Sequence, residues 1–299
     1  MERRVPTEQA RLEAAGQALA QVATSLSDAF ARELARVLRL AERALLPILT
    51  DAKAGKRTAR SIAGKALPLR TELRAVLTKA GYDRLVSHAS IEAVAQMADA
   101  LRASGNLPTG SALGRISPSR LTALAQLLDT DLMGVGDQAA HALWRASVQA
   151  IYTERPASAV IGELARTLEK SFAQAHTLFD TQVSIVGRQI VWLASVQDEQ
   201  QAYLYVGPVD SQTREWCLAQ VGMVRSQPAI ETLDNGQLPN PFLTAGGYNC
   251  RHSWLAVSDP ALVALKDSGQ RADGYEARVT MARTLKAQRK RFRELRRAA

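Results

Sequence analysis

The sequence has few cysteines, few aromatic residues and no long apolar run. Two cysteines in 299 residues are too few for a disulfide-stapled scaffold. Aromatic residues make up only 5%, so most of the core must come from Leu, Val, Ile and Ala. No run of about 18 apolar residues occurs, so we expect no transmembrane helix and no membrane partner. The first residues are polar and do not form an apolar signal core, so we expect synthesis in the cytoplasm.

Positive charge is concentrated at the C-terminal end. The formal net charge is +9, and residues 278–299 hold nine Lys or Arg against one acid, Glu294. Residues 1–277 are therefore close to neutral, and the chain as a whole is no general nucleic-acid-binding surface. A basic helix over 276–297 could lie on DNA without sequence preference, or on an acidic portal surface. The expected contact residues are Arg283, Lys286, Arg289, Lys290, Arg291, Arg293, Arg296 and Arg297.

Helical periodicity dominates the first 200 residues. Apolar residues at steps of three and four predict a helix over 7–50. It should be broken near 24–27 or pack along a partner, and Pro47 should end or kink it. Gly134 and Gly136 should interrupt a later helix that begins at residue 118. The remaining predicted helices cover 69–80, 83–103, 137–153 and 157–198.

The periodicity changes after Gln201. Alternation over 203–206 predicts a strand, and further short strands are predicted at 221–224 and 248–257. We therefore predict a mainly α protein, in which a long helical N-terminal region precedes a small α+β module and a basic C-terminal helix. The predicted segments are an N-terminal helical region (1–105), a second helical domain (106–201), the α+β module (202–260) and a basic helical tail (261–299).

Both cysteines lie in the module, and four chemistries are open for them. Cys217, Cys250 and His252, with Asp210 as a fourth group, suit tetrahedral zinc. There is no Cys-x-x-Cys pair, and residues two apart on a strand lie about 7 Å apart, so a shared ion needs a bend. The cysteines could instead form a disulfide outside the reducing cytosol. They could also supply a nucleophile with a histidine base, or be free thiols in a core.

A turn pattern precedes the first cysteine. In the sequence Asp-Ser-Gln-Thr at 210–213, Asp210 or the following serine can accept backbone N–H bonds and start a helical turn over 213–219. Arg251 should point to the strand face opposite its two neighbours, where it could pair with Asp210 or Glu215. We expect these groups to have structural roles.

Nine residues of this region form a motif: Asp210, Thr213, Arg214, Cys217, Gly222, Asn249, Cys250, Arg251 and His252. Their order resembles the phage Mu F-like head-morphogenesis (minor head protein) family. The helix over Ala175–Arg188, with Thr181, resembles the helix that leads into that family's module. The resemblance covers residues 157–257. Gln212 stands where the family usually has Arg, and Gly247-Tyr248 where a His-Pro pair is common, which removes one possible metal ligand.

The resemblance implies a minor structural protein of a tailed bacteriophage or prophage, located in the virion at the head interior or near the portal. The implied partners are portal and capsid proteins, with packaged DNA as a further contact. It implies neither an enzyme nor a small-molecule substrate. The alternative hypothesis is a metal-dependent nuclease or toxin-like effector that uses Cys217, Cys250 and His252.

Overall fold

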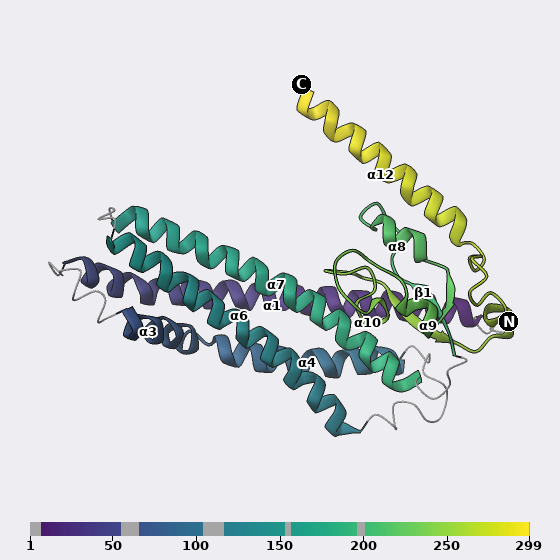
Figure 1. Cartoon of the computed structure of the whole chain (residues 1–299), viewed down its shortest axis with the longest axis horizontal. Coiled ribbons are helices and arrows are strands. Elements are labelled where there is room, and N and C mark those ends of the chain that lie inside the picture. The colour runs from purple at the N-terminus through teal and green to yellow at the C-terminus, as the bar shows by residue number, and fades with distance from the viewer. Residues whose placement is uncertain (1–6, 55–65, 104–116, 153–156, 196–200, 299) are drawn as a thin grey trace, which may run out of the picture. The chain divides into compact units, whose positions relative to one another are not determined.

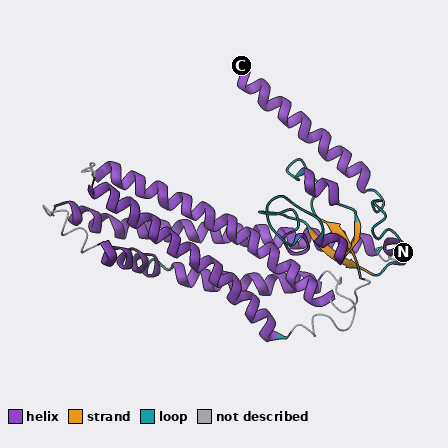
Figure 2. Ribbon diagram, viewed as in Figure 1, coloured by secondary structure: helices purple, strands orange, loops and turns teal. Residues whose placement is uncertain are grey.

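We describe the fold from a computed structural model, which covers residues 7–54, 66–103, 117–152, 157–195 and 201–298 (Figure 1). Helices dominate it, and the strands occupy a small part of the chain (Figure 2). The predicted mainly α class is confirmed. The long helices before the module are α1 (Glu8–Ala54), α3 (Ala66–Lys79), α4 (Tyr82–Ala103), α6 (Pro118–Tyr152) and α7 (Ala157–Ser195).

The described residues belong to two compact units. The first unit draws on Met1–Thr24, Val94–Leu121 and Thr181–Ala299. The second draws on Ser25–Ala93 and Thr122–Asp180. Each unit therefore combines parts of several of the four consecutive segments predicted above, because the long helices contribute residues to both.

The helix α1 is continuous over 47 residues, so of the alternatives given above it neither breaks near 24–27 nor ends at Pro47. Most stability of a helix in a protein comes from packing of its apolar face, which can outweigh a local breaker. In α1 that face is buried at regular intervals, for example at Leu19, Phe30 and Val37.

Packing in the second unit gives a reason for a glycine within the uninterrupted helix α6. A Cβ atom at Gly136 would lie 2.6 Å from the ring of Tyr82, so this glycine makes room for a side chain of α4. The Tyr82 hydroxyl donates a hydrogen bond to the carbonyl of Leu132 at 2.7 Å. In the same unit, Phe30 stacks on Phe179 with ring centroids 4.2 Å apart. The predicted interruption at Gly134 and Gly136 is therefore wrong, because Gly136 serves helix packing and not chain reversal.

The first unit contains a three-stranded antiparallel sheet. Its central strand, β1 (Ala202–Val206), lies between β2 (Val224–Ser226) and β3 (Ser253–Val257). Every residue of β1 is buried, as expected for a central strand covered on both faces. The strand predicted at 203–206 is confirmed.

The other two strands begin later than predicted. Gly222 has a φ of +80° and Asn249 a φ of +53°, and this left-handed backbone departs from the extended conformation of a regular strand. The pairing of β2 therefore begins at Val224 and that of β3 at Ser253.

Short helices and one longer helix complete the first unit. Side chains of Ser226, Asn240 and Asp259 cap three of the short helices, each of which has a proline in its first turn. No helix within the described ranges is long and apolar enough to cross a membrane. The elements are α8 (Glu215–Gln220), α9 (Gln227–Glu231), α10 (Pro241–Thr244), α11 (Pro260–Val263) and α12 (Tyr275–Ala298).

Gly222 offers a test of this packing. A Cβ atom there would lie 2.5 Å from Cγ of the buried Tyr275. We expect Gly222→Ala to lower the free energy of unfolding by about 2–4 kcal/mol, because left-handed backbone and a displaced ring both cost stability.

The matched control is Gly236→Ala. Gly236 also has a positive φ, +69°, but a Cβ atom there would meet no other atom within 4 Å. Its loss should be about 1 kcal/mol, from backbone strain alone. Urea unfolding followed by circular dichroism measures both variants, and equal losses would contradict the packing of Gly222 against Tyr275.

Candidate metal centre

Cys217, Cys250 and His252 form one buried cluster. The two Sγ atoms lie 3.7 Å apart, and Sγ of Cys250 lies 3.8 Å from Nδ1 of His252. The three possible ligand atoms lie within 4.8 Å of one another. Each side chain is at most 4% exposed, and both cysteines are free thiols. The structure thus brings together three of the residues that the sequence singled out.

A bend before β3 makes this approach possible. Cys250 and His252 precede β3, so the prediction that they share one face of a strand is wrong. The left-handed residue Asn249 turns the chain just before Cys250. In this bent segment the two side chains turn toward each other, which a strand would prevent.

Two glycines make room for the cluster. A Cβ atom at Gly246 would overlap Sγ of Cys217, and the Gly246 N–H donates to Sγ of Cys250 at 3.2 Å. A Cβ atom at Gly207 would lie 2.6 Å from Cδ2 of His252. Any larger residue at either position would displace a member of the cluster.

Tyr205 of β1 supplies a fourth polar group that the sequence pattern did not single out. Its hydroxyl lies 3.6 Å from each of the two sulfurs. Its ring stacks on the ring of His252, with centroids 5.3 Å apart and planes 8° apart. Burial raises the pKa of Tyr205, so the phenol is neutral at ordinary pH. The sequence could indicate Tyr205 only as a core residue, from its place in a predicted strand. It could not indicate that the hydroxyl lies beside the two sulfurs.

Nε2 of His252 is buried and has no hydrogen-bond partner among the described residues. The position of the imidazole is therefore set by its stacking on Tyr205 and by the contact of Nδ1 with Cys250.

The two thiols influence each other's protonation. The hydrogen bond from Cys217 lowers the pKa of Cys250, and the nearby His252 lowers it further. The same hydrogen bond raises the pKa of Cys217, and burial adds to that rise. The pair therefore titrates as a unit, in which the first proton leaves far more readily than the second.

Asp210 does not join the cluster. Its two carboxylate oxygens each accept a hydrogen bond from Arg251 at 2.9 Å. One of them also accepts from the Gln212 N–H and the Thr213 hydroxyl. The predicted pairing with Arg251 is confirmed, as is the acceptance of a backbone N–H bond by Asp210. The predicted helical turn over 213–219 is wrong in its start, because α8 begins at Glu215 and has no side-chain cap. The prediction that Asp210 is a fourth metal ligand is wrong. Among the described residues the group of possible ligands comprises Cys217, Cys250 and His252, and the carboxylate of Asp210 bonds Arg251 instead.

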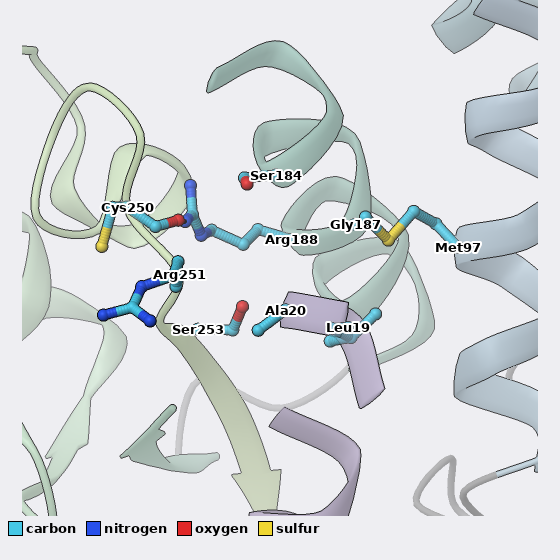
Figure 3. Close-up of a pocket in the computed structure, with 9 residues that line it drawn as sticks. All are labelled: Leu19, Ala20, Met97, Ser184, Gly187, Arg188, Cys250, Arg251 and Ser253. Atoms are coloured by element: carbon cyan, nitrogen blue, oxygen red, sulfur yellow. The ribbon is translucent and has the colours of Figure 1, made fainter. Parts of the chain in front are cut away.

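Arg188 of α7 holds the segment that carries Cys250 and His252. Its side chain is buried, and its guanidinium donates to the carbonyls of Leu243, Cys250 and His252 at 3.0, 2.6 and 2.9 Å. Figure 3 shows Arg188 extending from its helix to the backbone at Cys250. Seven residues earlier on the same helix, Thr181 bonds both the N–H and the side chain of Asn249. The helix α7 thus fixes the bend that forms the cluster.

Arg214 holds the other side of the bend. It donates to the carbonyl of Gly246 at 2.5 Å, to the carbonyl of Tyr248 and to Oε1 of Gln237 at 3.0 Å. Neighbouring Glu215 pairs with Lys286 of α12 at 2.8 Å and not with Arg251. The arginines of the motif therefore bond backbone and side chains of the module itself.

A small cavity lies beside Arg188, between α7, α1 and the segment before β3 (Figure 3). Its lining includes Ser184, Gly187 and Cys250. Its volume of about 10 Å³ is close to the minimum that one water needs. It has no room for an organic substrate.

The basic residues predicted to contact DNA or portal lie on α12. Lys286 is half-buried against the module, where it also donates to the carbonyl of Thr213 at 3.1 Å. Arg283 lies 3.6 Å from Glu215. The side chain of Arg297 lies outside those described. The exposed basic side chains among the predicted contact residues are Arg283, Arg289, Lys290, Arg291, Arg293 and Arg296.

The nine motif residues lie in one unit of the structure, and most of them are joined by direct contacts. Gly222 lies against Tyr275, and Asn249 is bonded to Thr181. Comparisons with protein-family models, with characterised proteins and with solved structures yield no match. The resemblance to the Mu F-like family stays a prediction from the sequence.

The ion pair of Asp210 gives a pH dependence with a definite sign. Burial raises the pKa of Asp210, but hydrogen bonds from Arg251 and Gln212 outweigh it and hold the pKa at about 2. Because this is below the pKa of about 3.9 in an unfolded chain, the carboxylate stabilises the fold above pH 4. That stabilisation is lost as the pH falls from about 4 through 2.

We expect Asp210→Asn to lower the free energy of unfolding by about 1 kcal/mol at pH 7, a modest value because the pair is partly exposed. The difference from the wild type should shrink toward pH 2. Urea unfolding at both pH values measures it. A difference that stays constant or grows as the pH falls would contradict the role of the ion pair.

Proposed function

We propose that this protein is a minor structural protein of a tailed-phage or prophage head, which docks to portal and capsid proteins during assembly. The observation that carries the proposal is the use of the motif residues. Those that resemble the Mu F-like family hold one module together: Arg251 bonds Asp210, Arg214 bonds the bend, and Cys217, Cys250 and His252 meet inside. A module of this kind is a rigid scaffold for docking.

The nuclease or effector alternative needs features that the cluster lacks. A hydrolytic metal site keeps one position open for water and has space for its substrate beside it. Here the three possible ligands are at most 4% exposed, and the hydroxyl of Tyr205 faces the two sulfurs. The neighbouring cavity has no room for a nucleotide. These observations favour docking over catalysis.

Two thiols and one imidazole form a donor set that suits zinc. With Zn–S bonds of about 2.3 Å, two thiolates on a tetrahedral ion lie about 3.8 Å apart. The sulfurs of Cys217 and Cys250 are 3.7 Å apart. Cys217, Cys250 and Nδ1 of His252 would hold the ion, with Tyr205 as the nearest fourth group. A zinc ion bound there would displace the thiol protons and add its binding free energy to folding.

We expect the purified chain to bind one zinc or cobalt ion, because the cluster offers one set of ligands. Cys217→Ser and His252→Ala should each remove it, and Asp210→Asn should retain it. The readouts are elemental analysis and the sulfur-to-cobalt absorption of the cobalt form. At a free zinc concentration about 100 times the dissociation constant, zinc should raise the free energy of unfolding by about 2.7 kcal/mol.

Asp210→Asn is the matched control, because Asp210 belongs to the same motif but bonds Arg251. Metal loss in that variant, with retention in Cys217→Ser, would contradict the assignment of ligands. A wild-type chain that binds no metal would leave the cluster as a pair of buried thiols beside a histidine.

The assembly function has its own test. We expect the chain to co-purify with the portal protein of the same phage when both are produced together, and to be found in purified heads in few copies. Quantitative mass spectrometry of heads and free tails measures this. Absence from virions, with full abundance in the host cytoplasm, would refute the proposal whatever the metal content.

A further inference from the structure

The helix α12 exposes large apolar side chains. Met281, Leu285, Phe292 and Leu295 are 65, 40, 60 and 61% exposed. The residues by which α12 packs on its own unit are different ones. Tyr275, Val279 and Ala282 are at most 2% exposed, and all lie in the first half of the helix.

The exposed apolar residues follow a heptad. Counting Gln288, positions 281, 285, 288, 292 and 295 are separated by steps of four, three, four and three. This is the spacing of alternating a and d positions in a coiled coil. At 3.6 residues per turn the five positions form a stripe roughly 80° wide, narrower than the apolar face of about 100° or more on an ordinary surface helix. We call these five positions the seam.

The seam does not overlap the packed face. Val279 points about 160° away from Met281 around the helix axis, at 3.6 residues per turn. The packing of α12 on its own unit therefore leaves the seam uncovered. Gln288 lies in the middle of the seam, at a d position.

The flanks of the seam are basic. Arg289 and Arg296 each follow a d position, and Arg291 precedes an a position, so all three lie where the partner helix of a coiled coil would pass. All three side chains are exposed, and the guanidinium of Arg296 lies over the ring of Phe292 at 5.1 Å. The one acid of this half of the helix, Glu294, lies away from the seam.

This charge opposes pairing of α12 with a second copy of itself. In a parallel pair, Arg291 of one copy would face Arg296 of the other, and in an antiparallel pair arginine would again face arginine. Like charges at these flanking positions select against such partners. A nucleic acid would neutralise the arginines but would leave Leu285 and Phe292 in water.

We propose that α12 is one helix of a heterotypic coiled coil, and that its partner is an amphipathic helix of another protein. That helix carries an apolar seam flanked by Glu or Asp. The inference rests on the proposed function only in that the chain works by docking. It adds the chemical class of the partner.

The test uses the full-length chain and a synthetic helix of about three heptads, with Leu at a and d and Glu at e and g. We expect binding at about physiological ionic strength, measured by fluorescence anisotropy of the labelled peptide. Leu285→Ser combined with Phe292→Ser should weaken binding at least about tenfold, since each removes an apolar side chain from the seam.

Two charge reversals of equal size separate seam contact from bulk attraction. Arg289→Glu with Arg296→Glu changes the flanks of the seam, whereas Lys290→Glu with Arg293→Glu changes other faces of α12. The first pair should weaken binding at least about tenfold and the second less than about threefold, because only the flanking charges face the peptide. A peptide with Lys at e and g should bind the first pair and not the wild type. Circular dichroism confirms that each variant is folded.

Three outcomes would overturn the inference. The first is absence of peptide binding together with duplex DNA binding that both charge-reversal pairs weaken equally. The second is absence of peptide binding with binding to anionic vesicles that depends on Leu285 and Phe292. The third is sedimentation as a dimer that depends on the same two residues. Because no phage protein is present in this test, its failure would leave co-purification with portal, and thus the proposed function, standing.

Discussion

The candidate metal centre depends on one buried guanidinium. Arg188 donates to three backbone carbonyls of the segment that runs from α10 to β3, and it is only 2% exposed. That segment is irregular, with left-handed backbone at Gly247 and Asn249, and cannot satisfy its own carbonyls by sheet pairing. Without the arginine, three carbonyls would lose hydrogen bonds to a charged donor, each worth about 1.5–3 kcal/mol. The hydrogen bonds of Arg188 therefore fix the positions of Cys250 and His252.

Other charged residues of the module also form hydrogen bonds or ion pairs within it. Arg214 bonds two carbonyls of the bend, and Arg251 bonds the carboxylate of Asp210. Lys286 connects α12 to the carbonyl of Thr213. Arg214 and Lys286 thus bond backbone carbonyls, and Arg251 bonds a carboxylate. These contacts support the proposal that the module works by docking.

The sequence pattern predicted correctly those features that depend on residues close together in the chain. The strand over 203–206 was identifiable because alternation is a property of neighbouring residues, and the grouping of both cysteines with His252 was visible in their sequence proximity. Gly136 could not be interpreted, because the reason for it is the ring of Tyr82, more than 50 residues away. The late start of β3 depends on the backbone angle at Asn249. The sequence suggests Asp210 as a ligand only because its strongest partner, Arg251, is distant in the chain.

Arg188 was not marked by the apolar stripe of α7. At 3.6 residues per turn it points about 160° away from both Val186 and Ile190, so the helical pattern places it on the other side of the helix. Its burial comes from its three carbonyl partners, which lie 55 to 64 positions further on in the chain. Tyr205 was hidden in the same way, since its relation to the sulfurs arises only from the folding of α8 and the bend onto β1.

The most direct test of this role of Arg188 is the reactivity of the Cys217 and Cys250 thiols toward an aromatic disulfide reagent, followed over time under native conditions. In the wild type both should react only as fast as the unit opens. In Arg188→Met, which keeps the length and removes the donors, both should react at least about tenfold faster while helical circular dichroism persists. Arg225→Met, which removes a bond to Gln220, should leave them protected. Thiols that stay equally protected in a folded Arg188→Met chain would show that the guanidinium does not hold the centre together.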